Sequence, residues 1–109
     1  ESMSTFEVQR RKGMSLEDQI VSVLEAAADP SKATDMARYM RDKFEFFGVQ
    51  SGPRRLALGP FLKGRSAVCR WPTVSVVCFC RRLWAKPQRE CQHAVCDILV
   101  AHQQHADAL

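Results

Sequence analysis

Apolar side chains recur at intervals of three and four residues along most of the chain, as they do in helices that bury one face. The pattern predicts five helices of about 10–15 residues joined by short links. They begin near residues 15, 30, 53, 72 and 88 and extend to about 28, 44, 62, 85 and beyond 99. The most regular stripe belongs to the last helix: Cys91, Ala94, Val95, Ile98 and Leu99. The sequence therefore predicts an all-α protein.

Local signals support the helix boundaries. Ser15 precedes two acids and suits an N-cap, and Asp29 is followed by Pro30 at a first helical position. Gly59-Pro60 should kink or interrupt the third helix. Residues 74–80 are almost entirely apolar and have strand-like propensity, but residues 81–84 follow without a turn signal, which favours one long buried helix.

The ends and links of these helices complete the domain plan. Residues 63–70 are expected to form a basic linker, and residues 1–14 a flexible N-terminal arm. Residues 15–109 then make one helical domain. Five short-linked helices predict antiparallel stacking, either as HEAT-like or armadillo-like helical hairpins or as a single bundle. No strict internal repeat is visible that would decide between the two.

A turn at residues 45–52 carries the most suggestive chemistry. Gly48 can adopt the left-handed conformation that stops a helix, and Ser51 can cap the helix that Pro53 opens. Arg54 and Arg55 follow in the first turn, where the helix dipole disfavours cations. An anion such as phosphate beside the unpaired backbone amides would explain two arginines there. The alternative is an ordinary helix–turn–helix corner with two solvated arginines.

The charge distribution points in the same direction. The chain carries 16 Lys and Arg against 12 acids, a net charge of +4. Residues 38–89 hold twelve of those cations but only two acids, Asp42 and Glu45, which gives this stretch a net charge of +10. Such a section attracts nucleic acid or another polyanion, although solvated helix faces can have the same composition. We expect Asp42 and Glu45 to be paired on the surface.

The five cysteines indicate a reducing, intracellular setting, because the count is odd and no secretory signal is visible. No apolar run is long enough for a membrane span. The spacings of Cys78 and Cys80, and of Cys91 and Cys96, do not fit a zinc knuckle even with His93 nearby, so we expect no metal and four buried thiols. His102 and His105 are expected on the surface. No nucleophilic triad or phosphate-binding glycine loop is visible.

Two segments resemble the N-terminal part of the AlkD-like DNA alkylation-repair glycosylases. The first is residues 36–51, MARYMRDKFEFFGVQS, with Arg54 and Arg55 after it, and the second is residues 83–92, LWAKPQRECQ, followed by Asp97-Ile98-Leu99. The resemblance covers about residues 29–105. It implies a curved stack of HEAT-like helical pairs whose basic concave face binds double-stranded DNA, and excision of cationic N3- or N7-alkylated purines without metal or organic cofactor. It places Gln50, Ser51 and the second arginine, Arg55, at the DNA backbone.

The chain also departs from that family pattern. Gly52 lies where the family has a proline, Gly59-Pro60 interrupts a helix that the family keeps continuous, and Cys91 replaces a frequent aromatic residue. The family's catalytic aspartate and its neighbouring tryptophans come after the second segment and have no match in residues 1–109, since Trp84 matches a structural tryptophan. We therefore assign no catalytic residue and expect this chain alone not to release alkylated bases.

Two functional hypotheses follow. The first is a DNA-backbone-binding portion of an alkylpurine DNA glycosylase, with Gln50, Ser51, Arg54 and Arg55 as the DNA-binding residues. The second is a non-catalytic helical-repeat interaction module. A DNA affinity that falls steeply with salt would favour the first hypothesis.

Overall fold

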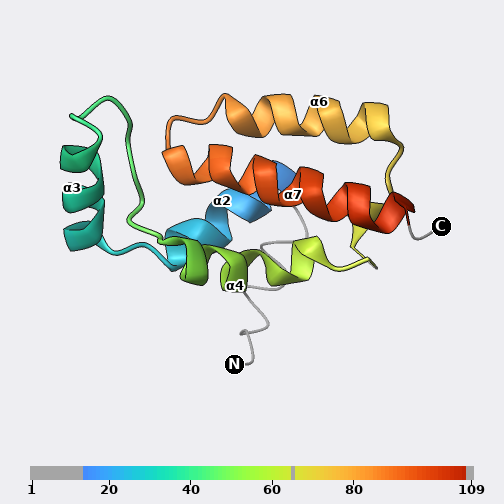
Figure 1. Cartoon of the computed structure of the whole chain (residues 1–109), viewed down its shortest axis with the longest axis horizontal. Coiled ribbons are helices and arrows are strands. Elements are labelled where there is room, and N and C mark those ends of the chain that lie inside the picture. Colours follow the sequence, from blue (N-terminus) through green and yellow to red (C-terminus); the bar gives the residue numbers. More distant parts are fainter. Residues whose placement is uncertain (1–13, 65, 108–109) are drawn as a thin grey trace.

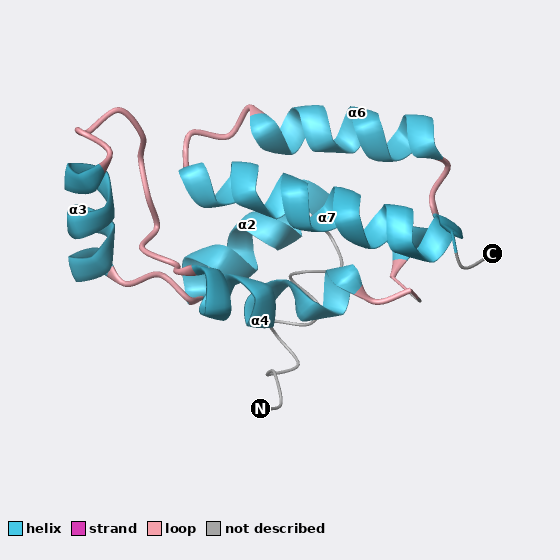
Figure 2. Cartoon of the chain, in the orientation of Figure 1, coloured by secondary structure: helices cyan, strands magenta, loops and turns pink. Residues whose placement is uncertain are grey.

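The computed structural model describes residues 14–64 and 66–107, which form six helices and no strand (Figures 1 and 2). The helices are α2 (Leu16–Ala26), α3 (Pro30–Tyr39), α4 (Ser51–Leu62), α5 (Ala67–Arg70), α6 (Thr73–Trp84) and α7 (Arg89–Asp107). The all-α prediction is confirmed, including helix for residues 74–84. The predicted arm lies almost entirely outside the described residues.

Helix α7 lies at the centre of the fold. Helices α4, α5 and α6 all pack against it, and α2 packs across α4 and α6. Helices α6 and α7 run antiparallel, side by side, in the manner of a helical-repeat hairpin (Figure 1). The shared core takes most of its bulk from Ile20, Leu24, Leu58, Phe79, Leu83 and Ile98, none of which is exposed to solvent. Trp71 closes one end of this core with its ring edge-on to Phe79, the ring centroids 5.6 Å apart.

The predicted helix starts are confirmed for α2 and α3. The Ser15 hydroxyl accepts from the Asp18 amide at 3.2 Å. The Asp29 carboxylate accepts from the amides of Ser31 and Lys32, and Pro30 is the first residue of α3. These side chains satisfy amide donors that a helix start leaves unpaired, so each stabilises the start of its helix.

Several predicted helix limits were wrong. Helix α3 ends at Tyr39 and not near residue 44, because Arg41 and Asp42 both adopt φ of 57° and turn the chain away. Helix α4 ends at Leu62 as predicted, but Gly59-Pro60 does not interrupt it: Pro60 is the third residue from its end, where its missing amide removes one late backbone hydrogen bond. The predicted linker contains the short helix α5, which is capped by the Ser66 hydroxyl.

Burial in α6 and α7 also differs from the prediction. Helix α6 buries the face that carries Val76, Phe79, Cys80 and Leu83, and Cys78 lies off that face and is exposed. On α7, Cys96 and Leu99 are also exposed, so three of the five thiols are buried.

The prediction of a surface histidine at position 102 was wrong. His102 is buried, and its Nε2 lies 2.9 Å from the Trp71 carbonyl oxygen. This contact ties the last turns of α7 to the link before α6. The side chain of His105 lies outside the described residues.

Helix α3 stands apart from the other helices (Figure 1). None of its ten residues is buried. An extended segment, residues 43–50, leads from it back to the start of α4. None of the helices in the described part of the chain is long and apolar enough to cross a lipid bilayer.

Candidate nucleic-acid interface

A buried carboxylate fixes the segment that leads into α4. Glu90 lies in the first turn of α7 and is fully buried. Its Oε1 accepts from the Phe47 amide at 3.0 Å, and its Oε2 accepts from the amides of Gly48 and Val49 at 2.9 and 3.0 Å. Three donors around one carboxylate offset the cost of burying its charge. The backbone just before α4 is therefore held rigidly against α7.

Gly48 is required in this segment by space as well as by conformation. It has φ of +91°, which side-chain-bearing residues rarely adopt. A Cβ on Gly48 would also lie 2.0 Å from the Asp29 carbonyl oxygen. The prediction of a left-handed Gly48 is confirmed, but the residue ends no helix. Instead it lets the chain pass the start of α3 closely enough to reach Glu90.

The start of α4 is exposed and has no side-chain cap. The N-cap is Gln50 and not Ser51 as predicted, and Pro53 lies in the third helical position. The Gln50 side chain makes no capping bond, and the amides of Ser51 and Gly52 find no acceptor among the described residues. Instead, the Gln50 Oε1 lies 3.4 Å from the Lys32 Nζ of α3. Uncapped amides at a helix start favour an anion.

The two arginines of the first turn have different positions. Arg55 is exposed, as the phosphate-binding prediction requires. Arg54 is buried, with 8% of its surface exposed. This burial differs from the alternative of two solvated arginines, and it leaves Arg54 less accessible to a phosphate than Arg55. Its Nε donates to the Asp97 Oδ2 at 2.8 Å, and its Nη1 lies 3.5 Å from the Nδ1 of His93. Because helical neighbours point about 100° apart, only Arg55 faces outward.

Arg89 extends the anchoring of this region to the residues before it. Its guanidinium lies over the Phe44 ring, 4.3 Å from the centroid, and also donates to the Gln92 side chain. Its backbone amide donates to the Glu45 carbonyl at 2.8 Å. The chain from Phe44 to Val49 is thus fastened along the first turn of α7.

Two adjoining hollows open between α3, this segment and α7. One, of about 620 Å³, is lined by the start of α4, including Gln50, Ser51 and Arg54. The other, of about 370 Å³, lies beside the apolar side of α3 and includes Phe46 and Arg89. Met36 and His93 line both hollows. A polar and an apolar surface therefore meet at one place.

His93 is neutral near pH 7. Burial lowers its pKa below the ordinary 6.5, and the neighbouring charges of Arg54 and Arg89 lower it further, while Glu90 and Asp97 oppose the shift. A neutral imidazole can accept from Arg54 through Nδ1. His93 thus contributes a polar edge to both hollows and adds no positive charge there.

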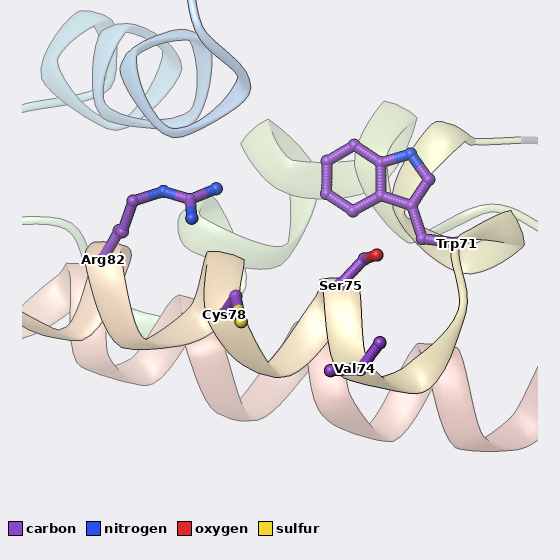
Figure 3. Close-up of a pocket in the computed structure, with 5 residues that line it drawn as sticks. All are labelled: Trp71, Val74, Ser75, Cys78 and Arg82. Atoms are coloured by element: carbon purple, nitrogen blue, oxygen red, sulfur yellow. The ribbon is translucent and has the colours of Figure 1, made fainter.

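A third hollow, of about 410 Å³, lies along α6 and is separate from the predicted site (Figure 3). Trp71 and Arg82 stand at its two ends, with Ser75 and Cys78 on the helix between them. The Arg82 Nε lies 3.2 Å from the Glu17 carboxylate of α2, so this arginine is already paired. None of the predicted DNA-binding residues lines this hollow.

The cysteines have the character of structural thiols where they are buried. Burial raises the pKa of Cys91 to about 11 and also raises the pKa of Cys80. Protonated thiols are poor metal ligands. Within residues 14–64 and 66–107, no group of three or more His, Cys, Asp or Glu is placed to hold a metal ion. Asp42 and Glu45 are exposed and, contrary to the predicted pairing, make no ion pair with any described residue.

Sequence reasoning missed Glu90 and His93. Glu90 follows Pro87 in the first turn of a predicted helix, where the helix dipole favours an acid. The dipole alone therefore explained an acid at this position, and no further role was expected. Nothing in the sequence shows that three amides, more than forty residues earlier, surround its carboxylate.

One comparison with known proteins identifies a family. The family model described as DNA alkylation repair enzyme matches residues 20–109. The chain therefore belongs to the DNA alkylation-repair family. No curated protein and no solved structure matches the chain.

Proposed function

We propose that this chain binds double-stranded DNA through the start of α4, with Gln50, Ser51 and Arg55 contacting the phosphate backbone. The observation that carries the proposal is an exposed helix start that is held from behind by a buried carboxylate. The amides of Ser51 and Gly52 have no acceptor among the described residues, while Glu90 fixes the three amides just before them. Membership of a DNA alkylation-repair family supports DNA as the anion.

The chemistry of these groups suits a phosphodiester. A helix start offers N–H donors and the positive end of the dipole, and the Gln50 and Ser51 side chains add neutral donors. Arg55 adds a charged fork that can reach a second phosphate oxygen. Such contacts position a protein on the duplex and carry no base sequence information.

Arg54 serves this surface indirectly. Its side chain is held by Asp97 and His93, so it faces α7 and not the solvent. We assign it the role of a positioning residue that fixes the first turn of α4 on α7. The proposal therefore uses three of the four residues predicted to bind DNA as direct contacts, and it names no catalytic residue.

The test is Arg55→Ala, with affinity for a short duplex measured at several salt concentrations. Loss of one phosphate contact should lower the affinity roughly 5- to 10-fold near 0.1 M salt and reduce the salt slope by about one unit. The loss should be equal for duplexes of different sequence. Arg81→Ala, which removes an exposed arginine from α6, is the matched control and should have a smaller effect. An unchanged salt slope together with a lower melting temperature would make Arg55 a structural residue.

A second candidate function is a helical-repeat interaction module. The observation that favours it is an apolar groove of about 220 Å³ between α6 and α7, in which Val77, Trp84 and Leu99 are exposed. Exposed apolar surfaces of this kind are typical of protein contacts. A chain that shows no salt-dependent DNA affinity would favour this candidate.

A further inference from the structure

The apolar groove between α6 and α7 lies outside the surface proposed for DNA and has a volume of about 220 Å³. Two of the side chains that line it, Cys80 and Val95, are buried. Three others, Val77, Trp84 and Leu99, are between 42% and 48% exposed. Large apolar side chains that gather at an open surface are typical of a contact with another molecule, since water solvates them poorly.

This apolar surface has the length of a short helix. One side of α6 carries four residues at spacings of three and four: Val74, Val77, Arg81 and Trp84. The stripe extends over about 15 Å, given the rise of a helix. Helix α7 runs antiparallel beside α6 and contributes Leu99 to the groove (Figure 1). The groove therefore follows the long axes of the two helices.

The shape of the groove favours a helix as its ligand. Proteins recognise peptides as added strands, as polyproline segments or as amphipathic helices. A strand needs the edge of a sheet, and the described residues form no sheet (Figure 2). A polyproline segment needs a groove lined by aromatic rings, and Trp84 is the one aromatic residue in this lining. The volume is also smaller than the roughly 300–1,000 Å³ of small-molecule sites, so large side chains of a helix fit it better.

The charge of the groove indicates the charge of its partner. Arg81 is the one charged residue in the lining, and it makes no ion pair with any described residue. Its neighbour Arg82, in contrast, is held by the Glu17 carboxylate of α2. An acid on a docked helix would pair with Arg81, whereas a base would be repelled. A second copy of the chain fits less well, because a two-fold contact would place two Arg81 side chains at one interface without an acid.

We propose that the groove between α6 and α7 binds an amphipathic helix of a partner protein, which places large apolar side chains in the groove and a carboxylate on Arg81. Tryptophan and arginine are among the residue types that most often dominate the energy of a protein contact, and Trp84 lies one turn after Arg81. The inference goes beyond DNA binding. It rests on the second candidate function, for which it names the kind of partner.

The experiment uses synthetic peptides of about 15 residues, a length at which isolated helices are marginal and binding can stabilise them. Two peptides share leucines at spacings of three and four residues, and they have either glutamate or lysine at the polar positions beside that stripe. The glutamate peptide should bind roughly 2- to 10-fold more tightly, because it gains an exposed ion pair and avoids a like-charge contact. Arg81→Glu should reverse this preference. A third peptide, with serine in place of the leucines, should not bind.

The fluorescence of Trp84 reports where the peptide binds. Trp84 is half-exposed, so a helix that covers it should shift its emission to shorter wavelengths. Trp84→Phe should remove this shift.

Val77→Asp tests the apolar part of the contact and has a matched control. It places a charge in the groove and should weaken binding of the glutamate peptide at least about 10-fold. In the control, Leu56→Asp, the charge is added at a residue of α4 that is 83% exposed and lies outside the groove, so binding should be unchanged. Arg55→Ala should also leave peptide binding unchanged. Melting temperatures show whether each variant is folded, and the exposed position of Arg81 keeps Arg81→Glu informative if Val77→Asp unfolds the chain.

The outcomes separate this inference from the functions proposed above. Equal affinity for the glutamate and lysine peptides overturns the acidic partner and leaves an interaction module in place. A chain that forms dimers, which Val77→Asp dissociates, also overturns the inference, because a second copy then occupies the groove. A monomeric chain that binds none of the peptides overturns both the inference and the second candidate function. DNA binding is tested apart from these results by Arg55→Ala.

Discussion

Helices α3 and α7 both begin with well-placed side chains, but only one of them is held by the core. Helix α7 is surrounded by α4, α5 and α6, and it buries Cys91, Ala94, Val95 and Ile98. Helix α3 has a good cap in Asp29 and Pro30 and buries no side chain. Most helical stability in proteins comes from packing and not from capping. The same chain thus has one helix that provides a rigid frame and another that leaves its apolar side available.

The segment between α3 and α4 is held in place mainly by α7 and not by α3. Glu90 and Arg89 hold it from behind, while the described residues of α3 make one side-chain hydrogen bond to it, between the Lys32 Nζ and the Gln50 Oε1 at 3.4 Å. The position of the α4 start is therefore set by α7. Changes at α7 should affect folding, and changes on α3 should affect only what binds there.

Replacing Glu90 by Ala should give the largest effect. The change leaves the amides of Phe47, Gly48 and Val49 without an acceptor in a buried place, each with a desolvation cost. We expect the free energy of unfolding to fall by about 3–5 kcal/mol, measured by urea denaturation. Glu45→Ala, at an exposed carboxylate in the same region, should change it by less than about 0.5 kcal/mol. A loss below about 1 kcal/mol for Glu90→Ala would contradict the claim that α7 holds the segment before α4 in place through this carboxylate.

Replacing Arg54 by Ala should give the second largest effect. It leaves the Asp97 carboxylate, whose side chain is 16% exposed, without its cation, and we expect a loss of about 2–4 kcal/mol. Arg55→Ala should cost less than about 0.5 kcal/mol, although we expect it to weaken DNA binding. Of these two adjacent arginines, one would then affect mainly stability and the other mainly DNA affinity. In the double variant with Asp97→Ala, the two losses should be less than additive, since one pair is removed. Equal stability losses for Arg54→Ala and Arg55→Ala would show that the two side chains are not distinguished by burial.

The elements predicted from local signals were mostly correct. Ser15, Asp29 and Pro30 mark helix starts through bonds within a few residues, and the stripe from Cys91 to Ile98 depends on helical geometry alone. Such features depend only on residues that are close together in the sequence. The end of α3 was not predictable in this way, because left-handed Arg41 and Asp42 are unusual for non-glycine residues.

The geometry around the candidate site could be predicted only in part. The charge pattern and the turn chemistry pointed to Ser51, Arg54 and Arg55, and the family resemblance added Gln50. Of these residues, Gln50, Ser51 and Arg55 are exposed, and their contact with DNA stays a prediction. The burial of Arg54 depends on Asp97, forty-three residues later in the chain, and the role of Glu90 depends on contacts of similar separation. Single-sequence periodicity reports which face of a helix is apolar, but it does not report which distant residue lies opposite a charge.

The smallest expected effect concerns acidity at His93, the residue of α7 that faces α3 through both hollows. Burial, then Arg54 and Arg89, lower the pKa of His93 below its unfolded value of 6.5, and Glu90 and Asp97 only partly oppose them. Asp35, across the hollow, is the other charge that faces it. Because the folded pKa is the lower one, the unfolded chain binds more protons as the pH falls through 6.5. The free energy of unfolding should therefore be highest above that pH and decrease below it, down to the folded pKa.

His93→Gln should flatten this part of the profile, measured as the difference between variant and wild-type urea midpoints at pH 7.5, 6.5 and 5.5. The opposite result is that the wild-type chain gains stability relative to the variant as the pH falls from 7.5 to 5.5. That result would mean that the attraction of Asp97 and Glu90 for a protonated His93 exceeds the repulsion from Arg54. His93 would then act as a cation that helps α7 hold the first turn of α4.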